Sequence, residues 1–269
     1  MSREKIVCKN NGFSLIELAI VIVIIALLIS GIIASQSLIK SAEIKEVISE
    51  YDRYIKSIKE FQDKYNALPG DMSNAETIWG SDASCPNTTE NTTPKTATCN
   101  GDGNGRIGSS ATDGTLSVQT EWFRAWQQLA NSGFIEGRFT GVKESATDGD
   151  AGIGINVPKS KLSIGAGWTI YYYLLTTTDT NLWGDNYGHV MAFGGDTTSV
   201  TNLPVISAND ALLIDQKIDD GTPGGGTIRA RRTASEANCT ANDTSQSAAT
   251  YNSGTVFERA CSLLFILGF

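Results

Sequence analysis

A single carboxylate, that of Glu17, stands inside a long apolar stretch of the chain. The stretch runs from Gly12 to Ile33 and reads GFSLIELAIVIVIIALLISGII. A bilayer core of about 30 Å needs about 20 apolar residues in a helix, and this stretch supplies that length. An ionised side chain in such a helix is unfavourable by roughly 2.5 to 3.5 kcal/mol on insertion scales. Glu17 therefore needs a cationic or hydrogen-bonding partner, and ion pairing is the chemistry that we predict for it.

A short basic leader precedes this stretch. Residues 1–12 carry three basic residues against one acidic residue, which predicts that this end stays in the cytoplasm under the positive-inside rule. An ordinary secretory signal is cut after its apolar stretch, whereas the junction of Gly12 and Phe13 lies before it. Cleavage at this junction would leave the apolar helix attached to the mature protein.

At these residues the chain resembles the type IV pilin and pseudopilin family, whose N-terminal signature is a basic leader, a glycine, Phe-Ser-Leu-Ile-Glu and an apolar helix. The resemblance implies that a prepilin peptidase cuts between Gly12 and Phe13 and that the new Phe13 amine is N-methylated. It also implies that Glu17 pairs with the N-terminal amine of a neighbouring subunit. The alternative is a single-pass anchor in which Glu17 lies near the membrane interface without a role.

One feature departs from many filament-forming relatives, which carry a proline about two-thirds of the way along the apolar helix. This chain has no proline between Phe13 and Leu68. Gly31 is the one weak position, and glycine disfavours a helix by only about 1 kcal/mol relative to alanine. We therefore expect an uninterrupted helix, which makes a principal shaft subunit a weaker interpretation than another subunit of the fibre.

The cysteines predict an oxidising compartment for the part of the chain beyond the leader. Cys8 lies in the leader, and Cys85, Cys99, Cys239 and Cys261 remain, which allows three pairings. No spacing matches a zinc or redox pattern. We favour two disulfides between neighbours in sequence, Cys85 with Cys99 and Cys239 with Cys261, over crossed pairing or free thiols.

One segment resembles the beginning of a calcium-binding loop. Side-chain oxygens stand at alternate positions in Asn100, Asp102 and Asn104, with glycine at the bend. The twelfth position is Ala111, where a bidentate glutamate is expected, and Asp113 is a possible substitute. We carry calcium as a candidate ligand and prefer a metal-free turn. For the acidic residues Asp215, Asp219 and Asp220 we likewise prefer a solvated turn.

No constellation typical of an enzyme is evident, so we expect no catalytic activity. His189 is the single histidine and has no serine or cysteine nucleophile motif near it, so we expect a structural role for it. The formal net charge is −8, and removal of the leader makes it −10, with 18 basic and 28 acidic residues. Such a balance does not suit phosphate binding, so no nucleic-acid partner is expected. For the arginines at positions 229, 231 and 232 we prefer a solvated loop.

Hydrophobic periodicity predicts an α+β fold. Apolar residues recur at helical spacing from Ser41 to Tyr65, which extends the apolar helix into an amphipathic one that Leu68-Pro69-Gly70 ends. Further on, the pattern predicts helices over Thr120–Ser132 and Asn209–Lys217, the latter capped by Asn209, and a loop over Asn74–Ile107. Strands are predicted over Trp168–Leu175, Gly188–Phe193, Thr227–Ala230 and within Val256–Leu267.

These elements predict a pilin-like architecture, with an antiparallel sheet packed on the long helix. We expect a cleaved leader (1–12), a transmembrane or filament-core helix (13–34), an amphipathic helix (35–68) and a globular head (69–269). The sequence predicts a minor or tip-type structural subunit of a type IV pilus or a type II secretion pseudopilus. Its partners would be copies of itself or other pilin-like subunits, the prepilin peptidase and the bacterial inner membrane, with the head in the periplasm. The alternative is an adhesin or ligand-binding head displayed on a pilin stalk.

Overall fold

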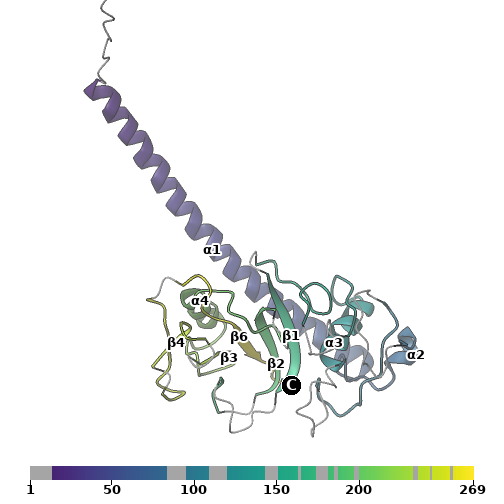
Figure 1. The fold of residues 1–269 in the computed structure, drawn as a ribbon. Helices are drawn as coiled ribbons and strands as arrows, with labels where there is room; N and C mark the ends of the chain where they lie inside the picture. Colours follow the sequence, from purple (N-terminus) through teal and green to yellow (C-terminus); the bar gives the residue numbers. More distant parts are fainter. Residues whose placement is uncertain are drawn as a thin grey trace, which may run out of the picture. The chain divides into compact units, whose positions relative to one another are not determined.

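The computed structural model describes most of the chain after the leader. The described residues are 14–83, 95–108, 120–142, 151–162, 165–173, 181–184, 187–196, 200–232, 236–242, 244–254 and 257–269. They divide into two compact units, one ending at Glu43 and one formed by Ile44–Phe269. Figure 1 shows the fold and labels most of the helices and strands.

The first unit consists of the N-terminal part of helix α1, which runs from Leu15 to Tyr65. The segment Leu15–Ile32 is, among the described residues, the one that is long and apolar enough to cross a membrane. None of this segment is buried within the protein, and its large aliphatic side chains are about half exposed or more. No break occurs at Gly31, so the prediction of an uninterrupted helix is confirmed.

The second unit is built on a four-stranded antiparallel sheet. Its strands lie in the order β1-β2-β6-β3, although β6 comes last in the sequence. The bounds are Ala166–Tyr173 for β1, Gly188–Gly195 for β2, Leu263–Ile266 for β6 and Ile228–Ala230 for β3. The register pairs Trp168 with Phe193 and Met191 with Phe265. The α+β fold with an antiparallel sheet is therefore as predicted.

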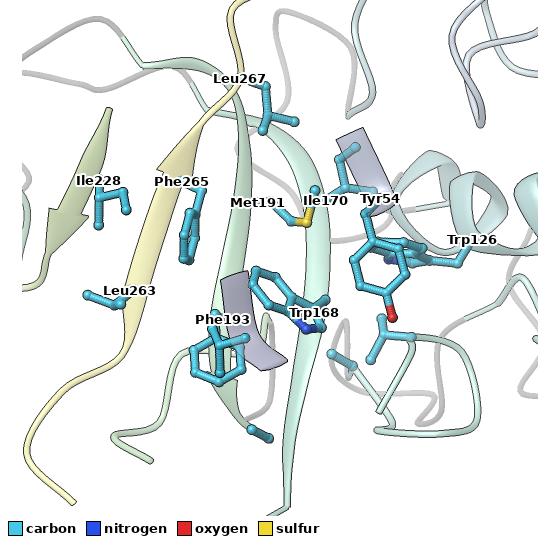
Figure 2. Packing of buried hydrophobic residues seen from close by; sticks show 14 of the residues in the cluster. Tyr54, Trp126, Trp168, Ile170, Met191, Phe193, Ile228, Leu263, Phe265 and Leu267 are labelled. Carbon is cyan, nitrogen blue, oxygen red and sulfur yellow. The ribbon is translucent and has the colours of Figure 1, made fainter. Parts of the chain in front are cut away.

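One face of the sheet carries large side chains that pack against α1. Figure 2 shows Trp168, Phe193 and Phe265 projecting from three neighbouring strands on this face. Tyr51 of α1 stacks on Phe265 with ring centroids 4.7 Å apart, and Tyr54 meets the edge of Trp168 at 5.9 Å. The predicted helical stripe is thus the face that is buried, because the described apolar positions from Ile44 onward join this core.

A buried carboxylate also fixes α1 to the sheet. The two oxygens of Glu50 accept hydrogen bonds from the indole Nε1 of Trp168 at 2.9 Å and from the backbone N–H of Lys161 at 2.7 Å. Glu50 is only 1% exposed. A buried acceptor that is satisfied by two donors sets the rotation of α1 on β1, because a slip of the helix would leave these groups unpaired.

The opposite face of the sheet is covered as well. A second cluster contains Tyr171 of β1, Val190 of β2, Leu264 of β6 and the ring of Tyr187. Helices α3 (Thr120–Asn131) and α4 (Ala208–Ile218) contact β1 and β3 respectively (Figure 1), but their buried apolar side chains, such as Trp126 and Ile214, belong to the first core, with α1. Successive side chains of β1 and β2 therefore enter the two cores in turn, one on each face of the sheet. This explains why apolar residues occupy both the odd and the even positions of these strands.

Several local predictions were wrong. The predicted loop Asn74–Ile107 contains the short helix α2 (Ala75–Trp79). Helix α4 is capped by Ser207 rather than Asn209, because it begins one residue earlier than predicted and the backbone N–H of Asp210 donates to Ser207 Oγ at 3.1 Å.

The last strand is shorter than the predicted run over Val256–Leu267. Before β6, the backbone of Cys261 is hydrogen-bonded to Ile206 instead of continuing the sheet. The two-residue strands β4 (Thr240–Ala241) and β5 (Thr250–Tyr251) form a small separate sheet that periodicity does not predict. Residues 174 and 175, predicted to end the first strand, lie outside the described residues.

Candidate functional site

The described part of the N-terminal segment begins at Ser14, so Gly12 and Phe13 lie outside it. Glu17 lies in the first turn of α1, where its Oε2 accepts a hydrogen bond from the backbone N–H of Ser14 at 2.8 Å. The hydroxyl of Ser14 accepts in turn from the N–H of Ile16 at 3.4 Å. This arrangement is a variant of the capping box, with the serine and glutamate at its usual spacing.

The segment that resembles a calcium loop is organised around two carboxylates from other parts of the chain. Asp71 Oδ1 and Oδ2 accept from the N–H groups of Asn104 and Gly105 at 2.9 and 3.0 Å. Glu121 accepts through Oε1 from the N–H of Asp102 at 3.0 Å and through Oε2 from that of Gly108 at 2.9 Å. These N–H groups of the loop therefore point at carboxylates.

The predicted calcium ligands have other hydrogen-bond partners. Asn100 Oδ1 accepts from the N–H of Glu76 at 2.9 Å, and the amide of Asn104 donates to Asp102 Oδ2 at 2.6 Å. Asp102 converges with Asp71 and Glu121, each offering one oxygen within 4.8 Å of the others. Sequence reasoning missed Asp71 and Glu121 because both are distant in sequence, and neither belongs to the loop pattern.

Burial raises the pKa of both of these carboxyl groups. The pKa of Glu121 is raised to about 8 and that of Asp71 to about 6, in each case chiefly by loss of water. The neighbouring charge of Asp102 adds to both shifts, while the donated backbone N–H groups oppose them. Three carboxylates at this separation repel one another when all are ionised, so proton uptake or a bound cation would relieve the cluster.

The cysteine prediction is met for one pair. Cys239 and Cys261 form a disulfide with an S–S distance of 2.03 Å, and both residues are fully buried. Cys99 is disulfide-bonded as well. Its predicted partner, Cys85, lies outside the described residues, so that pairing stays a prediction.

The apolar N-terminal segment also matches a known family. Residues 8–33 match the family described as the prokaryotic N-terminal methylation motif. This chain carries the type IV pilin and pseudopilin signal. No curated protein and no solved structure matches this pilin-like chain.

The histidine of the pilin-like chain is held in place through both of its ring nitrogens. His189 Nε2 accepts from the backbone N–H of Ile107 at 3.1 Å, which leaves Nδ1 to donate to the carbonyl of Phe269 at 2.9 Å. Burial is the main cause that lowers the pKa of this imidazole. The ring is therefore a neutral crosslink between β2, the loop that ends at Ile107 and the segment after β6.

Two groups that we predicted to be solvated are partly buried in the head of the pilin-like chain. Asp215 is fully buried, and its carboxylate accepts from the hydroxyl of Tyr251 at 2.8 Å and from the N–H of Gly221 at 3.1 Å. Arg229 is 4% exposed because it lies in β3. Periodicity could not reveal this burial, since both residues stand in polar, turn-rich sequence.

Proposed function

We propose that this pilin-like chain is a minor or tip-type subunit of a type IV pilus or a type II secretion pseudopilus. The observation that carries the proposal is the methylation motif at residues 8–33, which includes the apolar helical segment Leu15–Ile32, a segment that is not buried within the protein. An uncovered segment of this length needs lipid or other apolar helices around it. A membrane before assembly and the core of a fibre afterwards would supply both.

The minor or tip-type role draws its support from the head and from α1. Within its described residues, the head adds two covered sheet faces, three further helices and the Cys239–Cys261 disulfide to the helix that assembly requires. Helix α1 contains no proline over Leu15–Tyr65 and no break. A shaft subunit that must melt part of this helix would be expected to carry a weaker point than Gly31.

The proposed biogenesis has four steps. The chain inserts with its leader in the cytoplasm and its head in the periplasm, a prepilin peptidase cuts between Gly12 and Phe13, and the Phe13 amine is methylated. Glu17 then pairs with the N-terminal amine of an adjacent subunit as the helix enters the fibre. We propose no catalytic activity for the head.

The test is mass spectrometry of the full chain expressed with and without a prepilin peptidase. We expect the peptidase to yield a product that begins at methylated Phe13, and Gly12→Val to prevent it. A product that begins elsewhere in the wild-type chain would overturn the processing step.

Immunogold labelling of sheared fibres then separates the roles. Label at fibre ends or at sparse positions supports a minor or tip-type subunit, whereas continuous label along the fibre contradicts it. Deletion of the gene distinguishes the two assemblies. Loss of pili would indicate a type IV pilus, and loss of protein secretion would indicate a type II secretion pseudopilus.

A further inference from the structure

The head of the chain contains an open cavity of about 500 Å³ beside the end of α1. Its volume is within the range of small-molecule sites, which is about 300 to 1,000 Å³. The residues that line it include Gln62, Asn66, Asp71, Ser73, His189 and Phe269. These residues come from α1, the turn after it, β2 and the segment after β6, so the cavity lies where four parts of the head meet.

Three of the lining side chains are available to a ligand. Among the described residues, no hydrogen bond is made by the side chains of Gln62, Asn66 and Ser73. Two of them are carboxamides and one is a hydroxyl, so each can donate and accept. Gln62 lies in the last turn of α1 and Asn66 directly follows the helix, where its backbone N–H donates to the carbonyl of Gln62 at 2.8 Å, and both residues line the cavity.

The other polar members of the lining are already engaged within the protein. Asp71 accepts from the backbone N–H groups of Asn104 and Gly105. His189 is hydrogen-bonded through both ring nitrogens. These contacts hold the wall in place before any ligand arrives, which lowers the entropic cost of binding.

The charges around the cavity exclude one class of ligand. No lysine or arginine belongs to the lining, and its only full charge is the carboxylate of Asp71. The imidazole of His189 is kept neutral by burial, which lowers its pKa. A phosphate or carboxylate ligand would meet no cationic side chain in the lining and would be repelled by Asp71. Arg106, whose charge acts on His189, is not part of the lining.

We propose that this cavity binds a saccharide unit, with Gln62, Asn66 and Ser73 bonded to its hydroxyl groups and the half-buried ring of Phe269 against its C–H face. Sugar hydroxyls donate and accept at once, as do the three available side chains. An ammonium group only donates, so it would leave the amide N–H groups of Gln62 and Asn66 without acceptors. The inference gives a site to the ligand-binding alternative for the head and does not require the chain to enter a fibre.

The experiment uses the full chain in micelles of a polyoxyethylene detergent, which contains no sugar. Saturation-transfer NMR and titration are run with the methyl glycosides of glucose, galactose, mannose and N-acetylglucosamine, and with ethylammonium as the cationic probe. We expect at least one glycoside to bind. Both Gln62→Ala and Asn66→Gly should weaken it about fivefold or more, the effect of losing one hydrogen bond.

The variants are chosen so that folding does not confuse the result. Asn66 has φ of +52°, which glycine adopts without strain, so Asn66→Gly tests the amide alone. Gln216→Ala removes an exposed glutamine from α4, away from the cavity, and should leave binding unchanged. Binding by no glycoside, binding insensitive to both cavity variants, or binding of ethylammonium alone would each overturn the proposal. The binding assay does not depend on fibre formation. A failure of the chain to assemble into fibres would therefore not affect the saccharide-binding result.

Discussion

The carboxylate of Glu17 accepts a hydrogen bond from the backbone N–H of Ser14 within the same chain, at 2.8 Å. The residue predicted to pair with a neighbouring subunit therefore also closes the first turn of its own helix. A carboxylate has two oxygens and several lone pairs, so both contacts can coexist. Capping by Glu17 is an intramolecular role that the pairing hypothesis does not include.

Two substitutions of Glu17 separate these roles. Glu17→Gln keeps an acceptor for the Ser14 N–H, since glutamine serves in capping boxes, but it removes the charge. We expect Glu17→Gln to preserve amide protection over residues 15–18 by hydrogen exchange in micelles and to abolish entry into fibres. Glu17→Ala should lose both. Normal fibre entry of Glu17→Gln would show that the charge is not needed.

Loss of the Cys239–Cys261 disulfide should destabilise the head. The bond spans 22 residues and joins the segment before β4 to the segment that leads into β6. We expect Cys239→Ser to lower the free energy of unfolding in urea by about 2 to 4 kcal/mol. Cys8→Ser, in the leader, is the matched control and should change nothing. Equal stability of the two variants would argue against this bond in the exported protein.

The stability of the head should fall as pH rises from about 4.5 to 7. Burial raises the pKa of Glu236 to about 7 from 4.5, against the opposing hydrogen bonds of Ser262 and the charge of Arg231. In this window the folded state holds a proton that the unfolded state has released, so the stabilisation is complete below 4.5 and is lost through 7. Urea unfolding measured at a series of pH values should show this loss, which is about 3 kcal/mol for this group at 1.36 kcal/mol per pKa unit.

Glu236→Gln should flatten this slope, because an amide does not titrate and can still accept from the Ser262 N–H. If the stability of Glu236→Gln fell with pH as steeply as that of the wild-type chain, groups other than Glu236 would cause the pH dependence. The pKa of Asp215, raised to about 7 by burial, acts with the same sign, so Asp215→Asn in the same background should flatten the slope further and leave the contributions of Asp71 and Glu121, whose pKa values are also raised.

A calcium titration can separate the two sets of oxygens around the loop at Asn100–Ile107. Calcium binding by Asn100, Asp102 and Asn104 stays a prediction of the sequence. Because both carboxamides are hydrogen-bonded within the protein, we expect Asn104→Ala to keep any calcium-dependent rise in the unfolding midpoint and Glu121→Gln, which alters the carboxylate set alone, to remove it. If Asn104→Ala instead removed the calcium-dependent rise, the result would favour binding by Asn100, Asp102 and Asn104. No rise in the wild-type chain at millimolar calcium would dismiss the prediction.

Periodic features of the sequence predicted most of the framework. The stripe from Ile44 to Phe61 and the alternation in β1 depend on neighbours in the sequence, so they can be seen without a structure. The meeting of Asp71 with Glu121 depends on how α3 packs, and no local pattern encodes it. The spacing of Ser14 and Glu17 is a capping signal that the sequence contains. The apolar stretch around Glu17 favoured pairing with another subunit, so capping was not predicted.

The position of β6 has a consequence for the timing of export. This strand, Leu263–Ile266, pairs with β2 on one side and β3 on the other, so neither neighbour completes its ladder until these late residues are delivered. Such long-range pairing is slow to form. In the proposed topology the leader stays in the cytoplasm and the head crosses the membrane after the apolar helix. The head would then remain unfolded and competent for translocation until nearly all of it had crossed.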